Sequence, residues 1–535
     1  MKYLVWMLFP FLFSCMKGKE ADLIIHNARI HCLDDANRIE EAMAVKDGKI
    51  VEVGPERQIL NKYRSADIVD AQHKDVYPGF TDAHAHLFSL AKQQLGVDLT
   101  DCMSFDEVIK RLKSYQKKNH SKCIVGRGWD QTRWKDDDMP TNALLNEQFP
   151  SVPVVLYRID GHALLANEAL LSKIESSNVQ QLNGPLETGL FIDNEMKLPE
   201  AAIIDFSDRQ YQQQLVKIQQ QLLAFGITGV HEAGIDARQF NILKHLVKNN
   251  KLSIDLYAML SANEENYLLA KKIGILNYKN LSVRSFKLYM DGALGSRGAL
   301  LKEPYADAGT HYGQQLTSGN ALNVWIQRAI ALNYQLNVHA IGDRGNELVL
   351  KAFKQAFDRK PDHRWRIEHA QVVDPKDIHF FGDYAIFPSV QPTHATSDHD
   401  WAERRLGKKR LKGAYAYRSL YNQFGMLALG TDFPVEEINP FLTLRAAVLR
   451  IDRNNLPQRG YLINEALDLN TALRGMTIWP QFASFSESKR GLLIKGMEAT
   501  FFICAKSIDE QRIPSDNFSL KTFIRGKKVY DAEDF

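Results

Sequence analysis

Apolar runs of strand length alternate with helical patterns through most of the chain. Helical patterns cover 208–225, 319–332 and 344–357, where apolar residues recur every three or four positions. Eight strands separated by helices favour a (β/α)8 TIM-like barrel of parallel strands. A doubly wound sheet has the same alternation, so periodicity alone does not separate the two. The predicted strands end at Thr81, His231, Leu260, Tyr289, His339, His369, Val390 and Thr431.

The two ends of the chain have a different pattern. Residues 21–30 read as a strand, and Asp47-Gly48 marks a hairpin turn. Residues 499–503 and 522–530 read as further strands. Two β-rich ends around one long middle predict a small β domain that both ends of the chain build together.

The stretch from about 100 to 207 fits no single βα unit. It contains one strong strand, 152–157, and we interpret it as an insertion after the first barrel strand. Trp129 and Trp134 lie in this stretch. They could line an apolar, substrate-binding pocket or belong to the core of the insertion.

The first 20 residues predict export. Residues 3–13 form an apolar run that is too short to span a bilayer, which takes about 20 residues, and that is typical of a signal peptide. The segment Leu12-Phe13-Ser14-Cys15 resembles the lipobox of bacterial lipoproteins, which implies lipidation of Cys15. The alternative is a plain cleaved signal in which Cys15 is incidental. We expect a protein that is lipid-anchored to a bacterial membrane and faces the periplasm or the cell surface.

Composition narrows the class of protein further. The chain has 535 residues, of which 45% are hydrophobic and 24% charged, so it has material for a large core. Its formal net charge of +3 gives no reason to expect a nucleic-acid partner. Five cysteines in a chain of this length do not make a disulfide framework.

Metal-ligating residue types stand at the ends of several predicted strands. His84 and His86 follow the apolar run at 76–82 and are two positions apart, so both imidazoles can face one ion. A single pair of this kind is weak evidence. However, His339, His369 and Asp432 end later strands, at the edge where barrel active sites lie.

Each of these residues also has an ordinary alternative. A lone histidine is more often a core or loop side chain, and Asp432 could cap the segment after it. Lys287 lies within an apolar strand, where a cation is costly unless it is paired or modified, although a position on the alternate face or at the edge of the sheet would explain it too. All of them together are difficult to explain as coincidence.

The ordered motifs closely resemble the amidohydrolase superfamily, a group of barrel hydrolases that depend on metals. The finer resemblance is to the YtcJ-like branch, or amidohydrolase family 3, which includes N-substituted formamide deformylases. It covers nearly the whole chain from about residue 21. The motifs are Pro78-Gly79-Phe80-Thr81-Asp82-Ala83-His84-Ala85-His86, Gly128-Trp129-Asp130, Asp160-Gly161-His162, Gly226-Ile227-Thr228, Lys287 with 291–297, His339-Ala340-Ile341-Gly342-Asp343, Glu368-His369 and Gly430-Thr431-Asp432.

The resemblance implies a ligand set and a domain arrangement. His84, His86 and Asp432 would bind the more buried metal, a carboxylated Lys287 would bridge two ions, and the second ion would be held by His339 and His369. These donors suit Zn²⁺, with Mn²⁺, Fe²⁺ or Ni²⁺ as alternatives, and the site could hold one ion or two. The implied domains are a β-sandwich from 21–77 and 486–535 and a barrel over 78–485.

The predicted function is hydrolysis of a C–N bond of amide, N-formyl or N-acyl type by metal-activated hydroxide. Asp432 would take the water proton and pass it to the leaving nitrogen. His162, which follows a strong strand, is a candidate for a substrate-facing donor, or for a loop hydrogen bond. His394, after the seventh strand, is a second substrate-facing candidate.

Two other functions remain open. One is a deaminase or cyclic-amide hydrolase with a mononuclear site, although such enzymes often lack the bridging lysine. The other is a surface-binding lipoprotein without catalysis, which a missing ligand would have favoured. The expected partner is a small amide-like molecule, membrane contact is expected only through the N-terminal lipid, and a homodimer is one expectation for the assembly.

Overall fold

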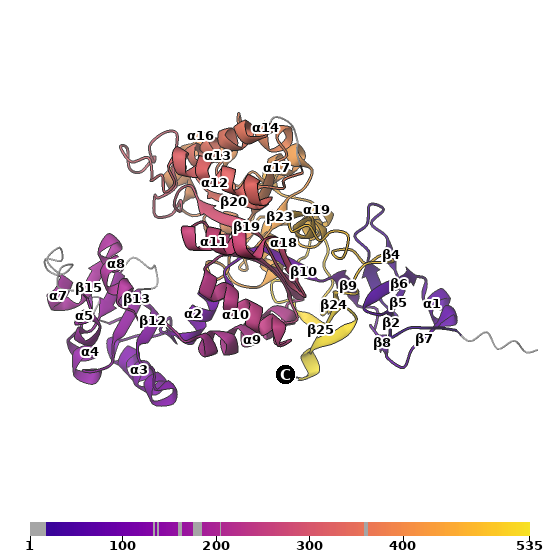
Figure 1. The fold of residues 1–535 in the computed structure, drawn as a ribbon, viewed down its shortest axis with the longest axis horizontal. Coiled ribbons are helices and arrows are strands. Elements are labelled where there is room, and N and C mark those ends of the chain that lie inside the picture. Colours follow the sequence, from indigo (N-terminus) through magenta and orange to yellow (C-terminus); the bar gives the residue numbers. More distant parts are fainter. Residues whose placement is uncertain are drawn as a thin grey trace, which may run out of the picture.

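The computed structural model describes residues 18–131, 134–135, 138–158, 163–174, 185–203, 205–357 and 362–534. A parallel barrel forms the centre of the molecule, with the insertion on one side and a β-sandwich on the other (Figure 1). The predicted fold class, a barrel with an insertion and a composite β domain, is therefore confirmed.

Eight parallel strands form the barrel in chain order, and an antiparallel strand, β18 (Leu276–Tyr278), flanks β19. Two strands continue four residues beyond their predicted ends at Thr81 and His231, to Ala85 and Ile235. The second one passes through Glu232, a charged residue inside a barrel strand. In the fold this carboxylate is buried and accepts hydrogen bonds from the backbone of Leu87 and Phe88. The strands are β10 (Phe80–Ala85), β16 (Ile227–Ile235), β17 (Asp255–Ser261), β19 (Leu281–Tyr289), β20 (Gln335–Ala340), β21 (Arg366–His369), β22 (Phe387–Val390) and β23 (Ala428–Leu429).

Amphipathic helices connect the barrel strands and pack on their outer side (Figure 1). The first, α9, begins with a capping box in which Ser207 and Gln210 satisfy each other's backbone N–H groups. The helices predicted at 208–225, 319–332 and 344–357 are confirmed to within a residue. The main outer helices are α9 (Asp208–Ala224), α10 (Ala237–Lys248), α11 (Glu264–Ile273), α12 (Gly319–Leu332), α13 (Asp343–Ala356) and α17 (Tyr417–Phe424).

The barrel is nearly closed between its first and last strands. No strand ladder joins β10 to β23 among the described residues. Instead, the Asp82 carboxylate accepts from the Thr431 hydroxyl at 2.7 Å and from its N–H at 3.1 Å. The Asp432 N–H donates to the His84 carbonyl at 2.8 Å. These bonds hold the two chain segments that carry the candidate ligands against each other.

Both ends of the chain build the β-sandwich. One sheet has the order β6-β5-β2-β8 and the other the order β26-β25-β24-β9-β3-β4. Apolar side chains from the two sheets, including Ile25, Val45, Phe501 and Phe523, form a shared core. The strands are β2 (Leu23–His26), β3 (Arg29–His31), β4 (Ile39–Glu40), β5 (Ala42–Lys46), β6 (Lys49–Gly54), β8 (Ile68–Asp70), β9 (Asp75–Pro78), β24 (Phe501–Cys504), β25 (Ser519–Ile524) and β26 (Lys527–Asp531).

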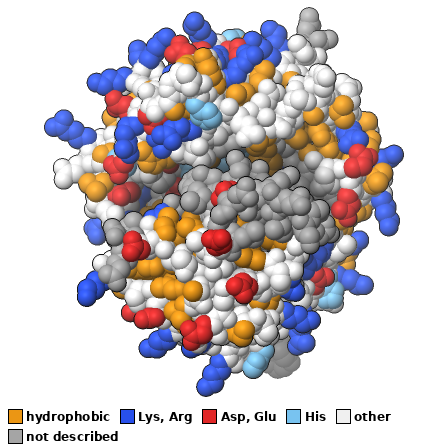
Figure 2. All heavy atoms as spheres, turned by 90° about the vertical axis from the view of Figure 1, so that its left-hand side faces the viewer, with side chains coloured by type: hydrophobic (Ala, Val, Ile, Leu, Met, Phe, Trp, Pro, Cys, Tyr) orange, Lys and Arg blue, Asp and Glu red, His pale blue; other side chains and the backbone are white. Residues whose placement is uncertain are grey.

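The insertion has a sheet of its own, in the order β11-β12-β13-β14-β15, with α3 (Phe105–Asn119) packed against it. This sheet begins at Val97, slightly before the predicted start of the insertion. On the face that Figure 2 shows, basic side chains are interspersed with acidic ones. The strands are β11 (Val97–Asp98), β12 (Ile124–Trp129), β13 (Val154–Arg158), β14 (Ala163–Ala166) and β15 (Leu190–Ile192).

The predicted signal segment, with Cys15, lies outside the described residues. Among the residues that are described, none of the helices is long and apolar enough to cross a membrane.

Candidate metal centre

The six residues predicted as metal ligands lie together at the carboxyl ends of the barrel strands. Parallel strands bring side chains that are far apart in sequence to the same edge. His84 lies in β10 and His86 directly after it, Lys287 lies in β19, His339 in β20 and His369 at the end of β21, and Asp432 follows β23.

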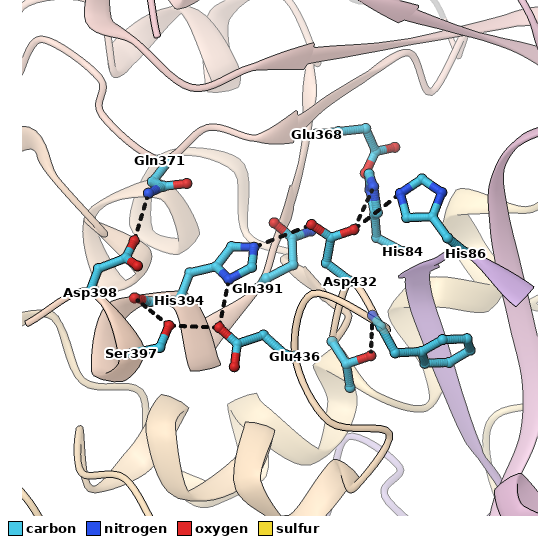
Figure 3. A network of polar contacts seen from close by, with 12 residues as sticks. His84, His86, Glu368, Gln371, Gln391, His394, Ser397, Asp398, Asp432 and Glu436 are labelled. Atoms are coloured by element: carbon cyan, nitrogen blue, oxygen red, sulfur yellow. Dashed lines mark hydrogen bonds and ion pairs between the residues drawn. The ribbon is translucent and has the colours of Figure 1, made fainter. Parts of the chain in front are cut away.

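Asp432 is the centre of the polar contacts (Figure 3). One carboxylate oxygen lies 3.1 Å from His86 Nε2 and 3.6 Å from His84 Nε2. The other lies 3.3 Å from Nε2 of His394. The ligand atoms of His84, His369 and Asp432 all lie within 4.8 Å of one another, which is the spacing expected of groups that hold one ion.

The remaining histidine continues this cluster. The ring of His339 lies 4.5 Å from the ring of His369, and the ring of His369 lies 4.8 Å from that of His84. His339 Nε2 and His369 Nδ1 are buried and have no hydrogen-bond partner in the described part of the chain. Because buried polar atoms are nearly always satisfied, two such nitrogens side by side fit a missing cation.

The backbone supports the same interpretation. His369 and Asp432 have φ values of +73° and +63°, which non-glycine residues rarely adopt. Such conformations cost about 1–3 kcal/mol each and occur preferentially at functional sites. Here they turn the two side chains at the ends of β21 and β23 toward the cluster.

The imidazoles are held in the form that binds metals. Burial lowers the pKa of His84 to about 4 and that of His339 to about 3. Burial also lowers the pKa of His369 well below its ordinary value. All three rings are therefore neutral at pH 7, and a neutral imidazole nitrogen is the usual histidine ligand of Zn²⁺ and related ions.

Lys287 is the unusual member of the cluster. Its side chain is buried, and Nζ lies 3.1 Å from His84 Nε2 and over the ring of Tyr289. It forms no ion pair with any carboxylate in the described residues. Burial lowers its pKa to about 8, so about a tenth of the amine is neutral at pH 7. The edge-strand alternative is excluded, because β19 is paired on both sides.

The donor set fits a divalent cation. It offers four imidazoles and one carboxylate, with a buried lysine beside them, and these nitrogen and oxygen donors suit Zn²⁺ and neighbouring transition metals. Burial raises the pKa of a carboxyl group, but the hydrogen bonds from His394 and His86 outweigh burial and hold the pKa of Asp432 well below its ordinary value. Asp432 is therefore an anion at neutral pH.

The other predicted site residues have different outcomes. His162 lies outside the described residues. His394 adjoins the cluster through Asp432, as expected for a residue facing the pocket. Trp129 is fully buried in the hydrophobic core of the insertion, and its indole N–H donates to the Leu156 carbonyl at 3.0 Å. This geometry favours the packing alternative for Trp129.

Sequence reasoning gave no role to the carboxylates behind the ligands. Glu368 Oε2 lies 2.6 Å from His84 Nδ1, and Glu436 Oε1 lies 3.0 Å from His394 Nδ1. Ser397 donates its hydroxyl proton to the same oxygen of Glu436 at 2.6 Å. Glu368 stood in a motif beside His369, whereas Glu436 lies in a loop with no distinguishing pattern.

A profile of the amidohydrolase family matches residues 67–530. The chain belongs to this family. The barrel and the six ligand-type residues at one of its ends are therefore those of a member of a hydrolase family.

Curated relatives of this amidohydrolase span nearly its whole length. Protein LONG AFTER FAR-RED 3 of Arabidopsis thaliana is 30% identical over 96% of this chain and 92% of its own. Putative amidohydrolase YtcJ of Bacillus subtilis is 28% identical over 95% and 99%. N-substituted formamide deformylase of Arthrobacter pascens is 24% identical over 90% and 93%. The chain is therefore a member of the YtcJ-like branch.

Solved structures agree with this placement. An uncharacterized metal-dependent hydrolase from Pyrococcus furiosus superposes with a TM-score of 0.79 and 26% identity, over 92% of this chain and 100% of that one. A zinc-bound adenosine deaminase from Xanthomonas campestris, with a TM-score of 0.54 and 14% identity over 96% and 94%, shares the fold alone. This amidohydrolase is accordingly a metal-dependent hydrolase.

Proposed function

We propose that this amidohydrolase hydrolyses a C–N bond of amide, N-formyl or N-acyl type in a small molecule. The observation that carries the proposal is the cluster of neutral imidazoles, Asp432 and Lys287 at one end of the barrel. The full-length similarity to an N-substituted formamide deformylase favours an N-formyl or related amide among the possible substrates.

His84, His86, His369 and Asp432 would hold a divalent cation, and His339 would hold a second if two are present. A cation bound there would supply Lewis-acid chemistry and would lower the pKa of a bound water toward neutrality. The surrounding side chains keep His84 and His369 neutral and Asp432 anionic, and all three are buried. His86, whose side chain is 21% exposed, is the most open of these four ligands.

Lys287 would be carboxylated. Its neutral amine attacks the carbon of CO₂, a new N–C bond forms, and one proton leaves the nitrogen, which yields a carbamate anion. The protonated amine is a buried cation with no carboxylate partner in the described residues, and burying such a charge is costly. The carbamate would remove this cation and would offer an oxygen ligand in its place.

Asp432 and His394 would move the proton. The carboxylate is anionic at neutral pH, so it can accept a proton from the attacking water and return it to the leaving nitrogen. Burial lowers the pKa of His394, but hydrogen bonds with Asp432 and Glu436 outweigh burial and raise that pKa well above its ordinary value. To donate to the oxygen of the substrate carbonyl, a protonated His394 would exchange its Nε2 contact with Asp432, which at 3.3 Å is longer than the 3.0 Å contact of Nδ1 with Glu436.

A cleft that is lined in part by Pro434 and Val435, which follow Asp432 in the chain, would have room for the rest of the substrate. It has a volume of about 410 Å³ and lies between the helix that follows β10, the insertion, and the loop after Asp432. Its walls are mixed, with apolar and polar side chains, as in many small-molecule sites. The lining includes Leu90, Val97, Thr100, Arg127, Pro434 and Val435.

The decisive experiment measures bound metal and amide hydrolysis together. The full-length chain is purified in detergent with bicarbonate, and metal is counted by elemental analysis while N-formyl and N-acyl amides are screened for amine release. We expect nearly two metals per chain, falling sharply in Lys287→Ala. The matched control is Lys279→Ala, which changes a lysine just before the same strand.

The other outcomes separate the alternative functions. About one metal per chain, unchanged in Lys287→Ala, would contradict the bridging lysine and favour the mononuclear deaminase-type enzyme. A chain that binds no metal even after reconstitution would contradict the hydrolase and favour a binding protein.

The location is a separate part of the proposal. Cys15 would be lipidated after export, so the full-length protein should partition into the detergent phase of a Triton X-114 extract. Cys15→Ala should move it to the aqueous phase or leave the signal uncleaved. If the unchanged protein itself partitions into the aqueous phase, the result would favour the plain cleaved signal, in which Cys15 is incidental.

A further inference from the structure

We propose that Glu368, held in place by Arg366, is a positioning residue that presents His84 to the metal. This inference rests on the metal centre proposed above and assigns a role to two buried charges that the reaction itself does not use. Both residues lie on β21, two positions apart, so both side chains point to the same face of the strand, into the barrel.

The first contact sets the tautomer of His84. Glu368 Oε2 lies 2.6 Å from His84 Nδ1, and neither side chain is exposed to solvent. Because a carboxylate only accepts hydrogen bonds, Nδ1 carries the ring proton and the lone pair is on Nε2. That nitrogen faces the cluster, 3.1 Å from Lys287 Nζ and 3.6 Å from Asp432 Oδ1.

The second contact fixes the carboxylate. Arg366 places its Nη2 2.8 Å from Glu368 Oε1, on the side away from His84. The same guanidinium is held by two further strands, because Nη1 lies 2.9 Å from His231 Nδ1 and Nη2 lies 3.3 Å from Met259 Sδ. One chain of contacts therefore runs from β16 and β17 through Arg366 and Glu368 to His84 in β10.

This arrangement is poorly explained by stability alone. Burying an ion pair is expensive, and apolar side chains of similar volume often stabilise a core as well or better. In His84 the nitrogen that does not face the cluster has this buried carboxylate behind it, while the other nitrogen faces Lys287. Partners of this kind behind metal-bound histidines fix ring orientation and raise ligand basicity.

The test compares metal affinity in Glu368→Gln with that in the unchanged full-length protein, by competition with a fluorescent zinc chelator. Glutamine keeps an oxygen acceptor but loses the charge that polarises the imidazole. We expect affinity to fall about 10- to 100-fold. The visible spectrum of the Co²⁺-substituted protein should also change, since ligand geometry sets it. Affinity within twofold of the unchanged protein would overturn the proposal.

A second variant covers the case in which Glu368→Gln fails to fold because it leaves Arg366 unpaired. Arg366→Met with Glu368→Gln removes both charges, and its metal affinity should fall by a similar factor. The control is Asp255→Asn, which breaks a partly buried ion pair with Arg490 at the opposite end of the barrel and should leave metal affinity unchanged. An equal loss in this control would assign the effect to general destabilisation and overturn the inference.

These outcomes also keep the inference separate from the proposed function. If the unchanged protein binds no metal, the proposed metal centre fails. If it binds metal and the Glu368 variants bind it equally well, only the positioning role fails.

Discussion

The two ends of the barrel use buried polar residues in opposite ways. At the carboxyl ends of the strands, His369 Nδ1 is buried without a hydrogen-bond partner in the described residues, and the contact of His339 Nε2 with Asp291 Oδ1 is long, at 3.7 Å. At the amino ends, polar groups are matched to each other. Asp255, the first residue of β17, forms ion pairs with Arg490 and Arg525. Gln335, the first residue of β20, accepts from the Tyr257 hydroxyl at 2.9 Å.

The same strands therefore carry a site at one end and structural contacts at the other. A buried polar atom without a hydrogen-bond partner destabilises a fold unless a ligand binds it, whereas charges that are paired with each other need no further ligand. The difference indicates that substitutions at the carboxyl ends should affect chemistry, and substitutions at the amino ends should affect stability. Five measurements test this contrast.

The largest expected effect is on turnover. Asp432→Asn removes the group that moves the proton, so kcat should fall about 1000-fold. Steady-state kinetics on the best amide from the screen measure this, and circular dichroism should show an unchanged fold. Full activity in this variant would exclude Asp432 from the reaction.

The second effect is on stability at the opposite end. Asp255→Asn leaves Arg490 and Arg525 facing a neutral side chain, so the free energy of unfolding should fall by about 3 kcal/mol. Denaturant unfolding measures the loss, and kcat should stay within twofold. A large fall in kcat without a loss of stability would contradict the contrast between the two ends.

The third measurement removes the metal. A ligand present at 100 times its dissociation constant stabilises the folded state by about 2.7 kcal/mol. Chelation should therefore lower the melting temperature of the unchanged protein and of Asp255→Asn alike. In His369→Ala the shift should be smaller, and an equal shift in that variant would remove His369 from the ligand set.

The fourth effect concerns the residue behind His394. Glu436→Gln should lower kcat about tenfold with little change in KM, because a hydrogen bond to a charged group contributes about 1.5–3 kcal/mol. Ser397→Ala is the matched control, since it removes the hydroxyl group that donates to Glu436 but leaves the contact between Glu436 and His394 in place. An equal loss in both variants would show that the whole loop, and not Glu436, is responsible.

The smallest expected effect is on the pH dependence of stability, and it concerns Glu52 in the β-sandwich, remote from the candidate site. Hydrogen bonds from Lys62 and Tyr63 lower the pKa of Glu52 to about 2. Because the folded pKa is depressed, the stabilisation is present above pH 4.5 and is lost as the pH falls toward 2. It should be below about 1 kcal/mol. The free energy of unfolding of Glu52→Gln should be lower than that of the unchanged protein at pH 6, and the two values should converge at pH 2.5. A difference that is the same at both pH values would contradict this prediction.

Much of the fold could be predicted because strand and helix patterns are local. The α9 and α12 helices matched their predicted ranges, since capping residues and apolar spacing act within a few residues. β16 continues four residues past its predicted end, and there the start of the helix after β10 satisfies the buried carboxylate of Glu232, a contact that no local pattern encodes.

The candidate ligands could be predicted for a related reason. Histidine, aspartate and lysine at strand ends form a readable pattern once the strands are assigned, and a parallel barrel brings those ends together. Trp129 shows the limit of this reasoning, because only packing decided that its ring lies inside the insertion. Glu368 and Glu436 show this limit as well, because no fixed sequence spacing links a carboxylate to the histidine that it contacts.

The sequence by itself determined the barrel, its composite β partner, the family and the six ligand-type residues, because these depend on periodicity and on the order of motifs. Only the tertiary structure decided which nitrogen of His84 faces the cluster and which histidine nitrogens lack partners. It also decided that Arg366, Glu368 and His231 share one buried chain of contacts. Those properties depend on distances between strands that are hundreds of residues apart in the chain, and no local pattern encodes such distances.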